Sequence, residues 1–324
     1  MKNKVKNKEL ITCIIPCFNE EEVISIFYKE ITKVSSEMKD VNFEYIFIDD
    51  GSKDKTLEIL RNYSRKDKRV RYISFSKNYG KEAGMYAGLN NAKGDYVAIM
   101  DVDLQDPPSM LKEMYKYIVE DGYDVAAIYS ESHKDYSFIR KGLTKLWYKI
   151  NYKLSGNQEK PGTRDFRLMK KKVVESIISM REVNRYTRGL YSYVGYNIKW
   201  ISIPTPDRVT GTSKFPLKKL ISYSLEAITS TSTKPLTISA NIGLLFCLIS
   251  FIFIIVIIIK TLTFGDPVSG WPSLACIITF LSGLQLFFFG ILGLYISKIY
   301  TEVKGRPIYF INETEKDIIK KEED

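Results

Sequence analysis

The chain has 324 residues, of which 45% are hydrophobic and 27% charged, and its formal net charge is +10 at pH 7. This composition excludes a disordered chain and allows one sizeable α/β domain with a smaller second part. The single histidine excludes a histidine-rich zinc site, so catalysis depends on carboxylates, basic groups and a metal. Four scattered cysteines form no disulfide framework, and we interpret them as small apolar residues.

The positive charge suits an anionic membrane surface. Nucleic acid is the competing partner for a basic chain, but the sequence contains no recognised nucleic-acid-binding module. Residues 1–6 include lysines but lead into no apolar targeting segment, so we predict no signal peptide. Membrane lipid is therefore the expected partner, and nucleic acid is not.

Short apolar runs bounded by turn residues recur in the N-terminal part, and we expect each to form a strand. These runs are 10–16, 43–49, 70–75, 96–100 and 125–129. Helical patterns lie between them at roughly 20–38, 55–66, 81–92 and 109–120. The alternation predicts an α/β fold with a Rossmann-like, mostly parallel sheet.

Ligands of such sheets bind beyond the carboxyl ends of the strands, and polar residues follow the first four predicted strands. Asn19 after the first strand is typical of a helix cap, whereas Glu20 is equally compatible with a structural and a functional role. After the second strand, Asp50 is the favoured ligand for a uracil N–H or a ribose hydroxyl. Lys81 either faces a phosphate group or is a solvated cation.

The fourth predicted strand leads into Asp101-Val102-Asp103-Leu104-Gln105-Asp106. Residues two apart in an extended segment point the same way, so Asp101 and Asp103 can converge on one hard cation, with Gln105 adding a neutral oxygen. Isolated Asp-x-Asp sequences are often only solvated loop residues, but the position at a strand end favours a metal site. Asp106, followed by Pro107, is expected to cap the next helix.

Three later segments indicate contact with a membrane. Residues 139–154 form a basic amphipathic pattern that suits a membrane interface or an ordinary surface helix. The runs 236–259 and 274–296 are each long enough to cross a bilayer core of roughly 30 Å, which predicts a two-helix transmembrane hairpin. Lysines and arginines flank the hairpin on both outer sides, so both termini and the N-terminal domain are expected in the cytoplasm.

These residues together resemble the inverting family-two glycosyltransferases that act on polyprenyl phosphate, the group of dolichol-phosphate mannose synthases and bactoprenol-phosphate glycosyltransferases. The resemblance runs almost end to end. Its motifs are Pro16–Glu21, Asp49–Ser52, Asn78–Ala83, Met100–Pro108, Asp165–Met169, Arg185–Gly189 and Arg208–Phe215. The paired apolar runs match the bacterial bactoprenol subgroup, which implies an enzyme of the bacterial plasma membrane.

The resemblance implies a GT-A catalytic domain over residues 1–213, a juxtamembrane segment 214–235, the hairpin 236–297 and a cytosolic tail 298–324. A possible homo-oligomer is left open. The implied nucleotide-sugar contacts are Pro16, Phe18, Glu20, Ile48, Asp50, Lys81, Asp101 and Val102. The implied Mg²⁺ or Mn²⁺ ligands are Asp101, Asp103 and Gln105, and the implied phosphate or acceptor contacts are Arg167, Arg208, Ser213 and Lys214.

The implied activity transfers one sugar from a nucleotide-sugar, expected to be a UDP-sugar, to undecaprenyl phosphate with inversion, for cell-envelope glycosylation. Asp103, Asp165 and Arg208 are the implied catalytic residues. The resemblance implies that Asp165 is a base, but a phosphate with a second pKa near 6 has little proton to lose. Asp165 is therefore either a base or a group that orients the acceptor or Arg167. The bactoprenol subgroup often has an arginine after the fifth strand, but this chain has none near Ser130. Arg164 is the candidate to replace it.

Two alternatives stay open at this point. A membrane glycan synthase with a non-lipid acceptor would share the donor site, although the sequence lacks the Gln-x-x-Arg-Trp signature of processive synthases. A catalytically silent scaffold that kept the fold would bind no UDP-sugar with metal. Retention of Asp101, Asp103 and Arg208 argues against the scaffold.

Overall fold

The computed structural model describes residues 8–130, 160, 162–204, 232–264 and 270–317, and it divides into two compact units. Described residues up to 204, together with 306–317, form the first unit. Described residues from 232 to 305 belong to the second. The amphipathic segment 139–154 and most of the juxtamembrane segment 214–235 lie outside the described residues.

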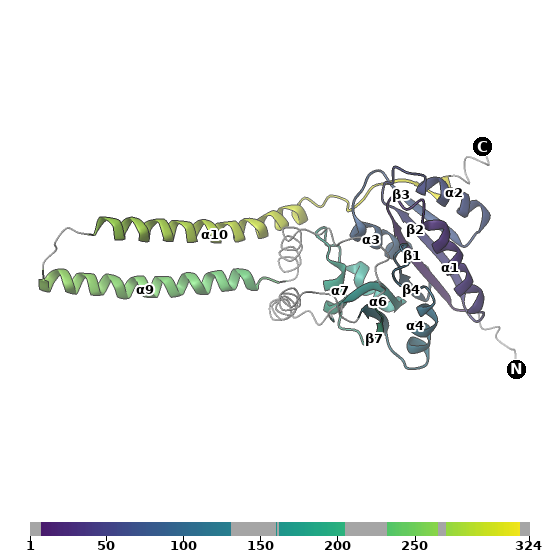
Figure 1. Ribbon diagram of the computed structural model, residues 1–324, viewed down its shortest axis with the longest axis horizontal. Helices are drawn as coiled ribbons and strands as arrows, with labels where there is room; N and C mark the ends of the chain where they lie inside the picture. The colour runs from purple at the N-terminus through teal and green to yellow at the C-terminus, as the bar shows by residue number, and fades with distance from the viewer. Residues whose placement is uncertain (1–7, 131–159, 161, 205–231, 265–269, 318–324) are drawn as a thin grey trace. The chain divides into compact units, whose positions relative to one another are not determined.

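The first unit contains one mixed sheet with helices on both faces (Figure 1). Its strands are β1 (Leu10–Cys17), β2 (Asn42–Asp49), β3 (Val70–Phe75), β4 (Tyr96–Ile99), β5 (Val125–Ser130), β6 (Thr163–Lys170), β7 (Ile198–Ile203) and β8 (Ile311–Thr314). Its helices are α1 (Ile24–Glu37), α2 (Thr56–Lys66), α3 (Lys81–Asn91), α4 (Met110–Val119), α6 (Lys171–Ser179) and α7 (Thr187–Tyr193). The five predicted strands and four predicted helices are confirmed, with small shifts at their ends.

The strand order is β7-β5-β6-β4-β1-β2-β3-β8. Strands β4, β1, β2 and β3 are mutually parallel, which places the carboxyl ends of all four at one edge. Strand β6 runs antiparallel to β4, and β8 runs antiparallel to β3 at the edge of the sheet. The predicted mostly parallel α/β sheet is confirmed, with antiparallel pairs at β3–β8, β4–β6 and β5–β6.

Two hydrophobic layers hold the sheet between its helices. Along β1, Cys13 and Ile15 face a core formed with α1, α2 and α4, whereas Ile14 faces a second core formed with α3 and α6. This alternation follows from the two-residue repeat of a strand, and burial on both faces explains the continuous apolar runs in the sequence. Cys13 and Cys17 are buried and free, as predicted for small apolar residues.

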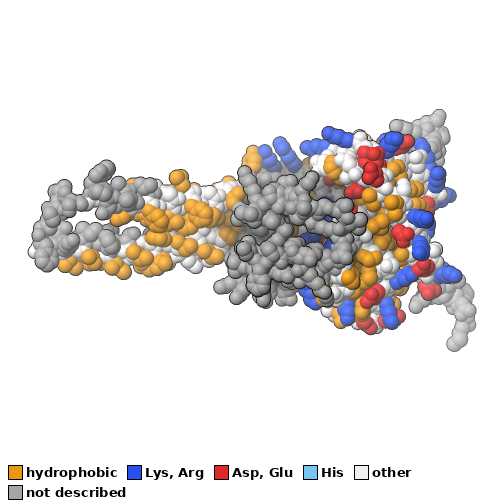
Figure 2. All heavy atoms as spheres, viewed as in Figure 1, with side chains coloured by type: hydrophobic (Ala, Val, Ile, Leu, Met, Phe, Trp, Pro, Cys, Tyr) orange, Lys and Arg blue, Asp and Glu red, His pale blue; other side chains and the backbone are white. Residues whose placement is uncertain are grey.

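The second unit contains α9 (Lys234–Phe264) and α10 (Trp271–Val303), which lie side by side (Figure 1) with Phe246 and Phe280 in ring contact at 6.1 Å. Hydrophobic side chains cover much of their visible surface (Figure 2). The predicted runs 236–259 and 274–296 fall inside these helices. Within the described residues, one stretch is long and apolar enough to cross a membrane, Phe280–Val303, so one of the two predicted spans is supported.

Candidate active site

The register between β4 and β6 brings two acidic residues together. Ile99 pairs with Arg167 in this antiparallel ladder, and continuing the register by two residues places Asp101 opposite Asp165. Asp101 follows the last residues of β4, and Asp165 lies near the start of β6. An antiparallel strand beside a parallel one therefore delivers a second carboxylate to the edge where ligands of α/β sheets bind.

Lys81 connects these two carboxylates. Its Nζ atom lies 2.6 Å from Asp101 Oδ1 and 2.6 Å from Asp165 Oδ2. Lys81 is the first residue of α3 and follows Gly80, whose φ of 91° is in the region that favours glycine. Burial opposes the charge on Lys81, but Asp165 and Asp101 outweigh it and raise the lysine pKa. Lys81 is thus a fixed cation between two carboxylates.

Asp165 is the most strongly held carboxylate of the site. Arg188 Nε, on α7, lies 2.8 Å from Asp165 Oδ1, while Lys81 contacts the other oxygen. Burial of Asp165 opposes ionisation, but Arg188 and then Lys81 outweigh it and hold the pKa of the Asp165 carboxyl far below its usual range. Asp165 therefore remains an anion at neutral pH, which makes it a weak proton acceptor.

Further carboxylates lie near Asp101, on Asp103, Glu20 and Asp54. Asp103 is exposed, and its Oδ1 accepts a hydrogen bond from the Gln105 N–H at 3.1 Å. The pKa of Glu20 is raised by burial, then by the negative charges of Asp103, Asp54 and Asp101. The segments after β1 and β4 therefore place carboxylates close enough to oppose one another's ionisation.

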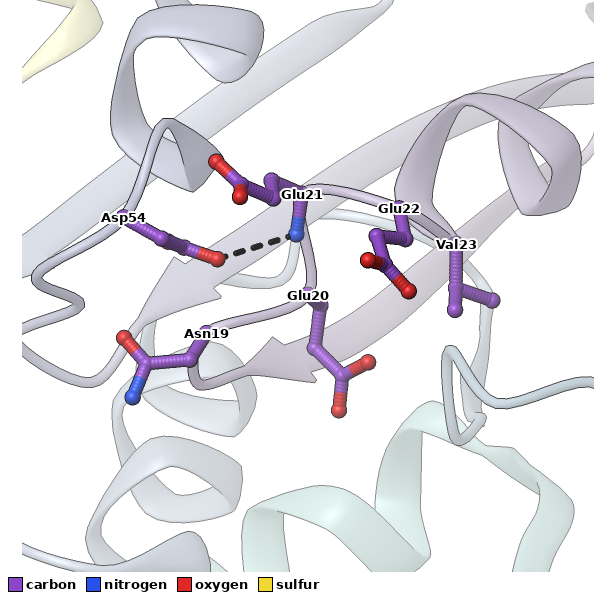
Figure 3. Close-up of a pocket in the computed structure, with 6 residues that line it drawn as sticks. All are labelled: Asn19, Glu20, Glu21, Glu22, Val23 and Asp54. Carbon is purple, nitrogen blue, oxygen red and sulfur yellow. Dashed lines mark hydrogen bonds between the residues drawn. The ribbon is translucent and has the colours of Figure 1, made fainter.

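A small pocket of about 180 Å³ opens on this side of the sheet (Figure 3). Its lining consists of Asn19, Glu20, Glu21, Glu22, Val23 and Asp54. The Glu21 N–H donates to Asp54 Oδ2 at 3.1 Å, and Glu20 extends away from that hydrogen bond (Figure 3). Asn19 does not cap α1 as predicted, because α1 begins at Ile24 and the Asn19 Oδ1 accepts from the Lys53 N–H instead.

The turn between Asp103 and Asp106 is held by a residue from β6. Arg164 Nη1 donates to Gln105 Oε1 at 3.0 Å, and Arg164 Nε lies 3.6 Å from Asp106 Oδ1. Leu104 has a φ of 58°, a left-handed conformation that costs a non-glycine residue about 1 kcal/mol or more. The prediction that Asp106 caps the next helix is wrong, because α4 begins at Met110 and Asp106 is buried against Arg164.

The residues predicted to bind metal have the right chemistry for a hard divalent cation. Asp101, Asp103 and Gln105 supply oxygen donors, and mutual repulsion between the nearby carboxylates is what such a cation would relieve. Among the described residues, no group of three His, Cys, Asp or Glu side chains is arranged as a ready metal site. Lys81 contacts Asp101 and Arg164 contacts Gln105, so cationic side chains lie beside two of these oxygen donors.

The predicted nucleotide contacts divide into surface and core positions. Phe18 is 44% exposed beyond the end of β1, and Pro16 is half-buried. Ile48 and Val102 are buried in the two hydrophobic cores, so their side chains contact protein. Of these four side chains, Phe18 is therefore the most exposed to solvent.

Asp50 organises the loop that leads to Lys81. Its two carboxylate oxygens accept the Tyr79 N–H at 2.6 Å and the Gly80 N–H at 2.9 Å. The pKa of Asp50 is raised by burial, with these two hydrogen bonds opposing the shift. Asp50 was predicted to contact the nucleoside, and the structure places it first of all as the residue that fixes the backbone before α3.

Gly51, which follows Asp50, lies against the backbone of Lys77 and Asn78 in the loop before α3. Its φ is 68°, and a Cβ atom added to it would lie 2.5 Å from the backbone carbon of Lys77. We expect Gly51→Ala to lower the free energy of unfolding by about 2–4 kcal/mol, because left-handed strain and overpacking add. Denaturant unfolding measures this loss. An unchanged unfolding midpoint would contradict the close approach of these two backbones.

Arg167 was predicted to contact the acceptor, and the structure places it in the interior. It is 0% exposed, its guanidinium lies 3.5 Å from the centre of the Tyr191 ring, and its Nη2 donates to the Arg164 carbonyl at 3.1 Å. This position supports the backbone around Asp165. The other predicted acceptor residues, Arg208, Ser213 and Lys214, lie outside the described residues.

Sequence reasoning missed the role of α7. Arg188 contacts Asp165, and the Thr187 N–H, one residue earlier, donates to Glu82 Oε2 on α3 at 3.0 Å. The Thr187 hydroxyl donates to the same Glu82 oxygen. The signal was present, because residues 185–189 stood out as a motif, but their partner became visible only when α7 was placed against α3.

Comparisons with known proteins identify the family of the chain. Residues 12–178 match the model of the family described as Glycosyl transferase family 2. The chain is 42% identical to the SfII prophage-derived bactoprenol glucosyl transferase of Shigella flexneri over 94% of this chain and 98% of that protein. It is 39% identical to the prophage bactoprenol glucosyl transferase homolog of Escherichia coli (strain K12), over 94% and 99% of the two chains.

Among solved structures, glucosyl-3-phosphoglycerate synthase from Mycobacterium tuberculosis, in complex with Mn²⁺, UDP and glucosyl-3-phosphoglycerate, aligns with a TM-score of 0.45 at 18% identity. The alignment covers 68% of this chain and 78% of that chain. The family match covers more than half of the chain, and the sequence relatives match nearly all of it. The chain therefore belongs to glycosyl transferase family 2.

Proposed function

We propose that this protein transfers a single glucosyl residue from UDP-glucose to bactoprenol (undecaprenyl) phosphate with inversion. The observation that carries this proposal is the contact of Lys81 with both Asp101 and Asp165 at the carboxyl ends of the parallel strands, with Asp103 two residues after Asp101. The acceptor and the sugar follow the names of relatives that match 94% of the chain. The product would be a lipid-linked sugar for cell-envelope glycosylation.

The cation of the proposed site would be Mg²⁺ or Mn²⁺, held by Asp101 and Asp103 with Gln105 as a neutral donor. Bound there, it would stabilise the negative charge of the UDP leaving group, a contribution of several kcal/mol. Arg164 contacts both Gln105 and Asp106, so it would keep the metal-binding turn in one conformation. Phe18 and Pro16 would line the nucleoside, with Glu20, Ile48 and Val102 shaping that side of the site.

In the proposed reaction, an oxygen of the lipid phosphate forms a bond to the anomeric carbon as the bond from that carbon to UDP breaks. The phosphate is already mostly dianionic at neutral pH, so no strong base is needed. Asp165 is an anion fixed by Lys81 and Arg188. Its proposed task is to hold these two cations where phosphate oxygens arrive, and Arg167 maintains the backbone beneath it. Arg208, Ser213 and Lys214 are proposed to bind the phosphate groups as well.

The proposed membrane arrangement has two spans. Helix α9 is 31 residues long and apolar over most of its length, which supports a second crossing beside the one in Phe280–Val303. The lysines and arginines that flank the pair support the proposal that both termini lie in the cytoplasm, at a bacterial plasma membrane. The segments 139–154 and 214–235 are proposed to lie at the lipid interface.

A donor panel tests the proposed function. Membranes that contain the protein are incubated with undecaprenyl phosphate, Mg²⁺ or Mn²⁺, and labelled UDP-glucose, UDP-N-acetylglucosamine, UDP-galactose or GDP-mannose, and the lipid fraction is extracted. We expect label in the lipid from UDP-glucose, with one sugar for each lipid. Label from another donor would correct the sugar, and label only in a non-lipid polymer would refute the acceptor.

A further inference from the structure

The segment after the last long helix returns to the sheet. Strand β8 pairs with β3, with Ile73 opposite Thr314 and Ser74 opposite Glu313. Glu313 accepts hydrogen bonds from Arg61 Nη2 at 2.6 Å and from the Tyr72 hydroxyl at 2.9 Å. Figure 1 shows this yellow strand beside β3 and α2. The tail, residues 306–317, is therefore part of the catalytic unit.

Just before β8, the tail contacts the loop of residues 76–80 and the strand that leads into it. The rings of Tyr309 and Phe75 stack with centroids 4.8 Å apart and an interplanar angle of 19°. The Ser76 N–H donates to the Phe310 carbonyl at 3.0 Å. Tyr79 completes the group, 5.9 Å from the Phe75 ring and 6.4 Å from the Phe310 ring.

The same loop carries the contacts that position Lys81. The N–H groups of Tyr79 and Gly80 both donate to Asp50, and Lys81 follows immediately as the first residue of α3. Lys81 then contacts Asp101 and Asp165. A continuous set of contacts thus runs from Tyr309 through the loop to the carboxylates of the site.

We propose that Tyr309 is a positioning residue for the transfer reaction, and that the tail holds the loop of residues 76–80 in the conformation that aims Lys81 at Asp101 and Asp165. This proposal rests on the proposed function, which places Lys81 in the active site. Phe75, at the end of the strand before the loop, and Tyr79, within the loop, both pack against aromatic rings of the tail. In this proposal the tail acts on the reaction through the loop.

The test compares Tyr309→Ala with Tyr309→Phe in the full-length membrane protein. Loss of the ring is expected to raise the KM for UDP-glucose and lower kcat, for a fall in kcat/KM of about 5- to 10-fold, the range one aromatic pair can control. Phenylalanine keeps the stacked ring and should restore kcat/KM to near the wild-type value. Glu313→Gln is the matched control. It weakens the contacts of the tail with Arg61 and Tyr72, which lie outside the loop, and should lower Tm without changing KM.

Hydrogen exchange supplies a readout that does not depend on activity. Faster exchange of the Tyr79 and Gly80 amides is expected in Tyr309→Ala, with wild-type rates in Tyr309→Phe. Unchanged exchange of these two amides in Tyr309→Ala would overturn the positioning role. So would a loss of activity in Tyr309→Ala that is no greater than the loss in Glu313→Gln, when the two variants show the same fall in Tm. If wild-type protein forms no glycolipid, the proposed function fails, while the exchange comparison still decides whether the tail holds the loop.

Discussion

Asp103→Asn is expected to lower the rate of sugar transfer at least about 100-fold, which corresponds to roughly 2.7 kcal/mol of transition-state stabilisation. Asp103 is exposed, and among the described residues its Oδ1 atom accepts a hydrogen bond from the Gln105 N–H. An asparagine oxygen can accept that bond equally well, so the substitution removes a charge and keeps the turn. The predicted loss is therefore a loss of cation binding beside the leaving group.

The measurement is the initial rate of lipid labelling at saturating donor, with the Tm recorded for each variant. Asp121→Asn is the control, because Asp121 is an exposed carboxylate after α4 and outside the site. We expect Asp121→Asn to keep the wild-type rate. Turnover of Asp103→Asn close to that of the wild type would remove Asp103 from the catalytic machinery.

Asp165→Asn is expected to lower kcat about 10- to 100-fold, less than Asp103→Asn does. The substitution removes the negative charge that Lys81 and Arg188 share, so both cations are held less firmly. Lys81 keeps its contact with Asp101, which limits the damage. A Tm measured beside kcat separates this effect from a loss of folded protein.

The pH dependence distinguishes an orienting carboxylate from a base. Because the pKa of Asp165 lies far below its usual range, Asp165 stays ionised as the pH falls from 8 to 5, and its ion pairs persist over that window. A fall in rate near pH 6 is expected from protonation of the acceptor phosphate. The same acid limb should remain in Asp165→Asn. A larger loss than that of Asp103→Asn, with the acid limb abolished and no rescue at high pH, would assign Asp165 as the base.

The first half of the fold was readable because its strands are buried on both faces. Mostly apolar runs such as 43–49 are typical of a strand covered on both faces, and turn residues mark the ends of such a run. Strand β6, with sequence Thr-Arg-Asp-Phe-Arg-Leu-Met-Lys, mixes charged and apolar residues and gave no such signal. Strand β8 is four residues long and polar, and it forms only because β3 offers an open edge.

The candidate site was predictable as a set of residues but not as a set of contacts. Asp101 and Asp165 are 64 positions apart, and only the antiparallel register of β6 brings them together. Asp106 has the sequence context of a helix cap, yet burial against Arg164 decides its environment. Ile48 and Val102 lie inside the cores because side chains of a two-sided sheet cannot all reach the ligand edge.

The proposed enzyme uses a divalent cation, held by acidic side chains near Lys81, to transfer glucose to a lipid phosphate. The most direct test of this cation site measures the label that wild-type and Asp103→Asn membranes transfer from UDP-glucose to undecaprenyl phosphate. The lipid-extractable label is measured before chelation, after chelation, and after Mg²⁺ or Mn²⁺ is returned. We expect chelation to abolish wild-type labelling, the returned cation to restore it, and labelling by Asp103→Asn to stay low throughout, as a cation site at Asp103 requires. Equal labelling by both proteins in the presence of chelator would contradict it.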